Sequence, residues 1–204
     1  DDPSRIFEVL GSMSKFRWVG EVFFNGEYHV AKYMPWDYIP TIIITTSPIF
    51  LILIFLVGLF VISKNLFINL INLRFNNENV WKNEIELFLS YSLCIIFLTI
   101  GLIIELSATV YNGWRQIYFI YPSIVFISIF GLNYLLKFQN YRRFTLIFIL
   151  LALLFNCYSI IKNHPYQYTF YNSIITNKNK KNFELDYYGV SNLDVLKKIS
   201  SLSD

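Results

Sequence analysis

The densest group of polar and aromatic residues that could do chemistry lies between two apolar runs of the sequence. It consists of Tyr111, Asn112, Gly113, Trp114, Arg115 and Gln116. The planar guanidinium of Arg115 can bind a phosphate or a carboxylate through paired hydrogen bonds. Trp114 can stack on a sugar or an isoprenoid, and Gly113 permits a tight turn or a close ligand. The same residues also fit a simpler role, because Trp and Arg anchor many helix ends at a membrane surface.

Glu105 is a second candidate, ten positions before Arg115 and at the end of an apolar run. A carboxylate near lipid is costly unless it is paired or reaches water. We therefore expect Glu105 either to pair with Arg115 or to extend into the headgroup water.

Three further candidates, His164, Glu184 and Asp186, lie near the end of the sequence. On a strand, the spacing of Glu184 and Asp186 would put both carboxylates on one face, where they suit acid–base work or binding of sugar hydroxyls. A solvated surface is the alternative. The histidines, His29 and His164, lie outside the apolar runs, and no residues have the spacing of metal ligands. We predict no metal site and identify no cofactor.

The composition favours a membrane protein and argues against nucleic-acid binding. Of the 204 residues, 55% are hydrophobic and 15% are charged, whereas about 25% of the residues in soluble domains are charged. A net charge of +3 is too small for a basic nucleic-acid-binding surface. Cys94 and Cys157 fall inside apolar runs, so we predict no disulfide.

Four runs without charge predict four transmembrane helices, over residues 41–62, 87–104, 117–136 and 144–161. About 20 apolar residues are needed to cross a bilayer as a helix, and only helices satisfy their own backbone in lipid. The predicted fold class is therefore an all-α polytopic helix bundle. Residues 1–40, before this transmembrane region in the sequence, and residues 162–204, after it, would be juxtamembrane segments.

The basic residues of the connections predict the orientation, because such residues favour the cytoplasm. Lys137, Arg142 and Arg143 lie between the third and fourth runs, and Lys64, Arg74 and Lys82 between the first and second. The remaining connection holds only Arg115. We therefore expect the Arg115 loop and both tails to face outward from a bacterial inner membrane. The aromatic belt expected at this outer surface comprises Trp36, Tyr38, Trp114, Tyr118 and Tyr121.

Local signals predict further elements near the spans. Asp2 and Pro3 can begin an amphipathic surface helix whose apolar face carries Ile6, Leu10 and Met13. Asn25-Gly26 predicts a hairpin turn, and Pro48 a kink in the first span. A helix is expected from Asn192, with Leu193, Leu196 and Ile199 on one face. We expect the sequence, which begins without Met and ends within a polar segment, to be the C-terminal portion of a longer protein.

Six short motifs, in this order, resemble the C-terminal half of bacterial proteins of the dolichyl-phosphate-mannose–protein mannosyltransferase-like group. This group belongs to the C-type integral-membrane glycosyltransferases. The motifs are Pro35-Trp36-x-Tyr38-x-Pro40, Thr45-Thr46-x-Pro48, Tyr111-Asn112-Gly113-Trp114-Arg115-Gln116-x-Tyr118, Tyr121-Pro122, His164-Pro165-Tyr166-Gln167-Tyr168-x-x-Tyr171-Asn172 and Phe183-Glu184-x-Asp186-Tyr187-Tyr188-Gly189-x-Ser191.

The resemblance implies an enzyme that moves a sugar from a polyprenyl-phosphate donor to an acceptor on the outer face of the membrane. It implies that the catalytic carboxylate lies in an outward loop upstream of this sequence. The 111–118 loop would line the donor pocket, with Arg115 at the lipid phosphate. Asn112 and Gln116 depart from the family pattern of Asp and His, so neither is expected to transfer protons. Tyr188 stands where the family has Trp.

A non-enzymatic role is the alternative, as a membrane scaffold or as a transporter or flippase component of envelope assembly. Transporters place charges near the middle of their spans. The four charge-free runs place their polar residues at the edges instead. This pattern favours chemistry at the membrane surface over translocation, but it fits a scaffold equally well.

Overall fold

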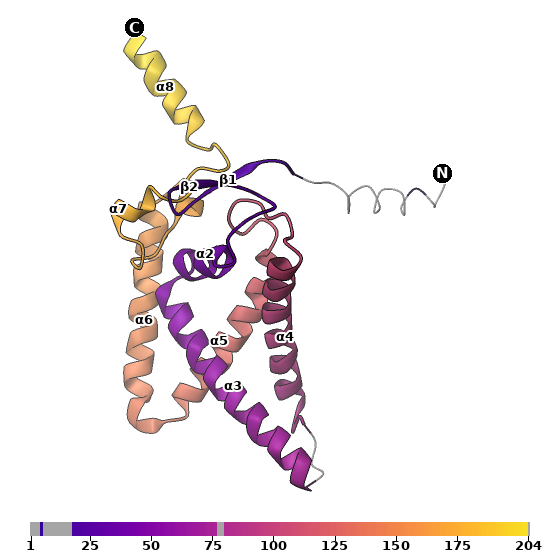
Figure 1. The fold of residues 1–204 in the computed structure, drawn as a ribbon. Coiled ribbons are helices and arrows are strands. Elements are labelled where there is room, and N and C mark those ends of the chain that lie inside the picture. Colours follow the sequence, from indigo (N-terminus) through magenta and orange to yellow (C-terminus); the bar gives the residue numbers. More distant parts are fainter. Residues whose placement is uncertain (1–4, 6–17, 77–79, 204) are drawn as a thin grey trace.

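The computed structural model describes residues 5, 18–76 and 80–203. The predicted amphipathic helix over residues 2–13 lies outside these ranges, Arg5 apart. The described chain is mostly helical, with one small two-stranded sheet (Figure 1). Its long helices confirm the predicted transmembrane helix bundle.

Four described helices are long and apolar enough to cross a bilayer. They are α3 (Ile49–Asn76), α4 (Glu84–Glu105), α5 (Tyr121–Leu136, preceded by the 3₁₀ turn η1, Tyr118–Ile120) and α6 (Gln139–Lys162). Their most apolar windows have mean hydropathies between 1.8 and 2.5. The protein is therefore membrane-embedded.

The first span differs most from its prediction. Residues 38–76 form two helices, α2 (Tyr38–Thr46) and α3, and the span begins at Ile49 and not at residue 41. Ser47 is extended, with ψ at 149°, because the ring of Pro48 disfavours a helical residue before it. Pro48 thus separates two helices where we expected a kink. Lys64, assigned to a connection, lies inside α3.

The other spans begin or end a few residues from the predicted bounds. α4 begins at Glu84 because Asn83 caps it, accepting a hydrogen bond of 2.8 Å from the Glu86 N–H. α6 already begins at Gln139 and includes Arg142 and Arg143. Long basic side chains can reach the headgroups from within a helix, so charge-free runs underestimate helix length.

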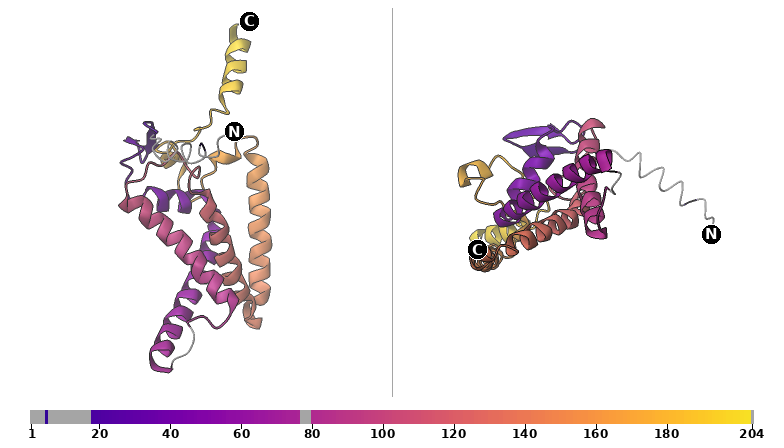
Figure 2. Two further views of the ribbon diagram at one scale, coloured as in Figure 1. Left: turned by 90° about the vertical axis from the view of Figure 1, so that its right-hand side faces the viewer. Right: turned by 90° about the horizontal axis from the view of Figure 1, so that it is seen from below.

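α3 and α5 cross at closely packed glycines. A Cβ atom on Gly58 would lie 2.2 Å from the Ile127 carbonyl oxygen, and one on Gly131 would lie 2.5 Å from that of Ile54. Small residues let helix backbones approach in lipid, where packing and not hydrophobicity drives association. By contrast, α6 contains no buried residue and stands at the side of the bundle (Figures 1 and 2).

The upper end of the bundle in Figure 1 carries a layer that we call the cap, made of residues 18–47, 106–117 and 163–191. Its hairpin pairs β1 (Glu21–Phe24) with β2 (Glu27–Val30), with Glu21 opposite Val30. Asn25 and Gly26 both have positive φ, as a two-residue hairpin turn requires, which confirms the predicted hairpin.

Late segments of the chain complete the cap. The Gly26 N–H donates to the Asn182 carbonyl at 2.9 Å, and the Glu184 N–H donates to the Phe23 carbonyl at 3.2 Å. Phe24 packs edge-on against Tyr38 and Phe183 in the buried interior. The described part of the N-terminal tail from residue 18, the C-terminal tail and the Arg115 loop therefore share one end of the spans.

The last part of the chain contains η2 (Gln167–Thr169), α7 (Asn177–Lys180) and α8 (Asn192–Ser203). The bounds of α8 confirm the predicted helix from Asn192. Figure 1 shows α8 extending away from the cap.

Candidate functional site

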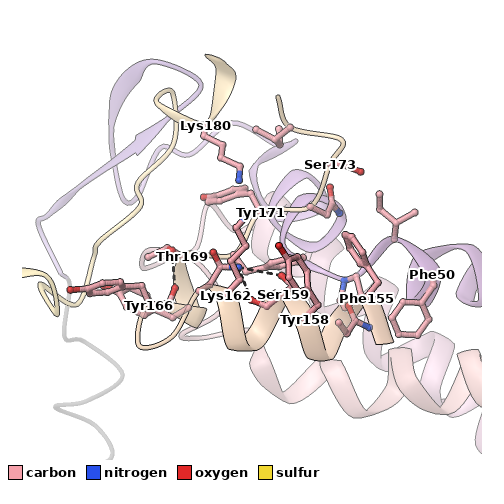
Figure 3. A pocket seen from close by; sticks show the side chains of 18 of the residues that line it. Phe50, Phe155, Tyr158, Ser159, Lys162, Tyr166, Thr169, Tyr171, Ser173 and Lys180 are labelled. Atoms are coloured by element: carbon pink, nitrogen blue, oxygen red, sulfur yellow. Dashed lines mark hydrogen bonds between the residues drawn. The ribbon is translucent and has the colours of Figure 1, made fainter. Parts of the chain in front are cut away.

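A large cavity of about 1190 Å³, which we call the α3–α6 cavity, lies between the first turns of α3, the second half of α6 and residues 166–191. Its apolar part is lined by side chains of both spanning helices. They are Phe50, Leu53, Phe148, Leu151, Ala152 and Phe155. Figure 3 shows Phe50 and Phe155 at one end and Tyr166 at the other. The cavity thus runs from the transmembrane region to the cap.

The polar end of the α3–α6 cavity carries two lysines. Lys162 belongs to the last turn of α6, where its Nζ lies 5.8 Å from the centre of the Tyr158 ring. Lys180 ends α7 and points down toward the cavity in Figure 3. Among the described residues, no carboxylate forms an ion pair with either ammonium group. Both charges are therefore available to an anionic ligand.

Asp186 also lines this end, but its oxygens are occupied. It accepts hydrogen bonds from the hydroxyls of Tyr168 and Ser191 and from the N–H groups of Val190 and Ser191, the latter two at 3.0 and 3.1 Å. The bond from the Ser191 hydroxyl is the main cause that lowers the pKa of Asp186. The charged carboxylate therefore holds residues 186–191 in place.

Asn172 joins the wall of the cavity to the break between α2 and α3. Its side-chain amide donates to the carbonyls of Ile44 at 2.6 Å and Ser47 at 2.8 Å. Its backbone N–H donates to the Thr45 carbonyl at 2.7 Å. The end of a helix leaves such carbonyls without helical partners. Asn172, 4% exposed, satisfies them where Pro48 interrupts the helix.

The predicted 111–116 site folds as a tight loop against α2. The Gly113 N–H donates to the Tyr38 hydroxyl at 3.0 Å, which in turn donates to the Tyr111 carbonyl at 3.2 Å. The Tyr111 N–H donates to Gln116 Oε1, and Trp114 Nε1 donates to the Thr46 hydroxyl at 2.7 Å. Gly113 has φ of +64°, in the left-handed region that favours glycine. These contacts place the loop firmly in the cap.

Tyr38 departs from its predicted place in an aromatic belt. It is only 3% exposed, and burial raises its pKa to about 12. Trp36 and Tyr118, in contrast, are 71% and 63% exposed and fit the predicted belt. Tyr38 is buried because its hydroxyl links the loop to α2, which the sequence pattern of a belt does not reveal.

Arg115 is exposed and contacts the segment that follows Asp186. Its guanidinium donates to the Tyr187 carbonyl at 3.0 Å and lies 5.1 Å and 4.3 Å from the centres of the Tyr187 and Tyr188 rings. These are its partners among the described residues, and Glu105 is exposed at the end of α4. Arg115 is not among the residues that line the α3–α6 cavity. Of the two expectations for Glu105, the structure thus fits extension into water.

Asn112 presents an acceptor without a partner. In the described part of the chain, its buried Oδ1 receives no hydrogen bond, and the same holds for the hydroxyl of Ser47. Buried polar atoms are nearly always paired, with protein or with water. A donor from water or from a ligand would therefore be favourable at Asn112.

The remaining predicted residues do not gather into one site. Residues 184–186 form no strand, and Glu184 lines a separate cavity of about 30 Å³, to which Gly113 also contributes. The strand that would put Glu184 and Asp186 on one face is therefore not formed. His164 is exposed, and its Nδ1 lies 2.8 Å from Gln167 Nε2.

Sequence reasoning missed most of the α3–α6 cavity, including Lys162, Asn172 and Lys180. A signal did exist for Asn172, since a helix broken by Pro48 needs a donor for its last carbonyls. The lysines gave none. Lys162 directly follows an apolar run, as lysines do at many membrane boundaries, and Lys180 lies in a polar stretch of Asn and Lys residues. No protein-family model matches this chain, and the comparisons with curated proteins and with solved structures find no significant match either.

Proposed function

We propose that this protein is the C-terminal membrane portion of a glycosyltransferase that takes a sugar from a polyprenyl-phosphate donor, and that the α3–α6 cavity holds that donor. One observation carries the proposal: the cavity joins an apolar part, between two spanning helices, to a polar end with two lysines that form no ion pair with any described residue. This is the pattern of a lipid with an anionic headgroup. The motif order in the sequence supports the same substrate class.

The parts of such a donor match successive parts of the cavity. The isoprenoid chain lies against Phe50, Leu53 and Phe155 at the depth of the spans. The phosphate lies between Lys162 and Lys180, whose ammonium groups serve as compact positive charges. The sugar then reaches the tyrosines of the cap, where aromatic faces and hydroxyls can bind it.

In this proposal Arg115 supports the cap and does not hold the phosphate. Its guanidinium keeps Tyr187 and Tyr188 against the 111–116 loop. The carboxylate for the transfer step is assigned, by the resemblance, to another loop of the enzyme. The cap faces outward from a bacterial inner membrane. The connection between α5 and α6 with Lys137, and the start of α6 with Arg142 and Arg143, lie at the end of the spans opposite the cap (Figure 1).

Binding of a polyprenyl-phosphate sugar to the purified protein in nanodiscs tests the proposal. The double variant K162Q/K180Q should bind roughly tenfold or more weakly for each lost charge–phosphate bond. The variant K178Q/K181Q removes equal charge from exposed neighbours and should bind normally. Neutral polyprenol carries no phosphate, so K162Q/K180Q and K178Q/K181Q should bind it with equal affinity. Equal donor binding by K162Q/K180Q and the unaltered protein would exclude this site.

A non-enzymatic scaffold is the second candidate, and one observation favours it. α6 exposes apolar side chains along its length and has no buried residue, so it can pack against helices of other proteins. A sugar-transfer assay on membranes separates the two functions. Transfer that depends on Lys162 and Lys180 supports the enzyme, whereas normal envelope assembly by a K162Q/K180Q strain supports the scaffold.

A further inference from the structure

Helix α8 has two chemically distinct faces. At 100° per residue, its large apolar side chains occupy one half of the helix. They are Leu193, Val195, Leu196, Ile199 and Leu202, and each is between 52% and 78% exposed. The opposite half carries Asp194, Lys197, Lys198 and Ser201. A helix of 12 residues with so much exposed apolar surface requires a partner, since short helices are marginal in water.

The start of α8 is fixed near the membrane boundary. The Tyr166 hydroxyl donates to the Asp194 carboxylate in the first turn of α8, and Tyr166 lies only four residues beyond the end of α6. Just before α8, Ser191 is bonded to Asp186. The helix therefore starts at the level where α6 leaves the transmembrane region.

We propose that α8 docks on the surface of the bilayer, with its apolar face among the acyl chains and its lysines at anionic headgroups. The positive charge of the segment around α8 favours an anionic bilayer as the partner of its exposed face. Lys197 and Lys198 flank the polar face, and residues 162–204 hold six lysines against four acidic residues. Amphipathic helices with lysines on the polar face bind anionic membranes in this manner.

Docking requires α8 to turn from the direction seen in Figure 1 toward the membrane plane. The connection 189–191 is the place for this turn. Gly189 has φ of +64°, and only the Asn192 side chain lies close to where its Cβ would be. Docking therefore breaks the bond from Tyr166 to Asp194 and the bonds that Asp186 accepts from Val190 and Ser191. The bond from the Tyr168 hydroxyl to Asp186 lies before the turn and is kept, so Asp186 stays at the wall of the α3–α6 cavity. The proposal does not depend on the function proposed above.

A fluorescent probe on each face of α8 tests the docking. The full chain with Cys94→Ser and Cys157→Ser receives a single cysteine by Ile199→Cys, or by Ser201→Cys on the opposite face. Each is labelled with an environment-sensitive dye and placed in nanodiscs of phosphatidylcholine, with or without phosphatidylglycerol. We expect a blue-shifted emission that brominated lipids quench for the Ile199 probe, and neither effect for the Ser201 probe.

Charge variants give a second, quantitative test. Each lysine near an anionic surface contributes roughly fivefold to binding, so K197Q/K198Q should lower the docking equilibrium about 25-fold. The K178Q/K181Q variant serves as a charge-matched control and should change it much less. Two results would overturn the proposal. One is emission from the Ile199 probe that brominated lipids do not quench, as expected if a second copy or another protein covers α8. The other is docking that is equal in nanodiscs with and without phosphatidylglycerol.

Discussion

The α3–α5 crossing and the α3–α6 side of the bundle are built in opposite ways. At the crossing, Gly58 and Gly131 bring two backbones together with no room for a methyl group. Along α6, no side chain is buried, and a cavity of about 1190 Å³ separates part of the helix from α3. The first region fixes the positions of the spans. The second leaves space for a ligand and can adapt to it.

Replacing a glycine of the crossing should have the largest effect. Gly131→Val puts a branched side chain against the backbone of α3, which cannot shift as a flexible side chain would. We expect a loss of about 3 kcal/mol or more in unfolding free energy, at the upper end for overpacking. Gly101→Val in α4 is the matched control, because nothing lies within 4 Å of its Cβ position. Denaturant unfolding in detergent measures the unfolding free energy of both variants. Equal losses for the two variants would contradict the close packing of the α3–α5 crossing.

Asn172 belongs to the α3–α6 side, where it lines the cavity and closes the end of α2. Asn172→Leu removes the donors to the carbonyls of Ile44 and Ser47 and leaves them buried. The expected destabilisation is about 2–3 kcal/mol. Asn179→Ala, at an exposed position, should cost little. If thermal unfolding of the Asn172 variant matched that of the Asn179 variant, the α2 end would have other donors.

Alkaline pH should weaken the cap in a defined window. Burial raises the pKa of Tyr38 to about 12, whereas the pKa of an unfolded tyrosine is about 10. The protonated Tyr38 therefore contributes fully to the unfolding free energy below a pH of about 10. This contribution is lost as the pH rises toward 12, at about 1.4 kcal/mol per pH unit. Tyr38→Phe should make the pH dependence of unfolding shallower there. Tyr28→Phe, at an exposed position of β2, should keep the original slope.

Filling the α3–α6 cavity should have the smallest effect on stability. Ala152 lines the cavity from α6, so Ala152→Phe should change the unfolding free energy by less than about 1 kcal/mol. The same variant should weaken donor binding, because the new ring occupies the path of the lipid chain. A loss of stability as large as that of Gly131→Val would mean that the cavity is closed in the membrane.

The sequence predicts the spans well because lipid imposes a simple rule on them, a long apolar run. It predicts the hairpin because Asn25-Gly26 is a local signal. It fails at Pro48, where the last carbonyls of α2 depend on Asn172, more than a hundred residues away. The 111–116 loop is visible as a local cluster, but its partner Tyr187 is not. The α3–α6 cavity joins three segments distant in sequence, so no local pattern can reveal it.

The bonds of Asn172 also bear on the order in which the protein assembles during synthesis. Asn172 follows Ser47 by 125 residues, so at about 5–20 residues per second the ribosome needs roughly 10 s to supply it. All four spans are made before then. Until then, the carbonyls of Ile44, Thr45 and Ser47 at the junction of α2 and α3 lack the donors of Asn172 and are left to water. The hydrogen bonds that complete the junction of α2 and α3 thus come from Asn172, which is translated after all four spanning helices.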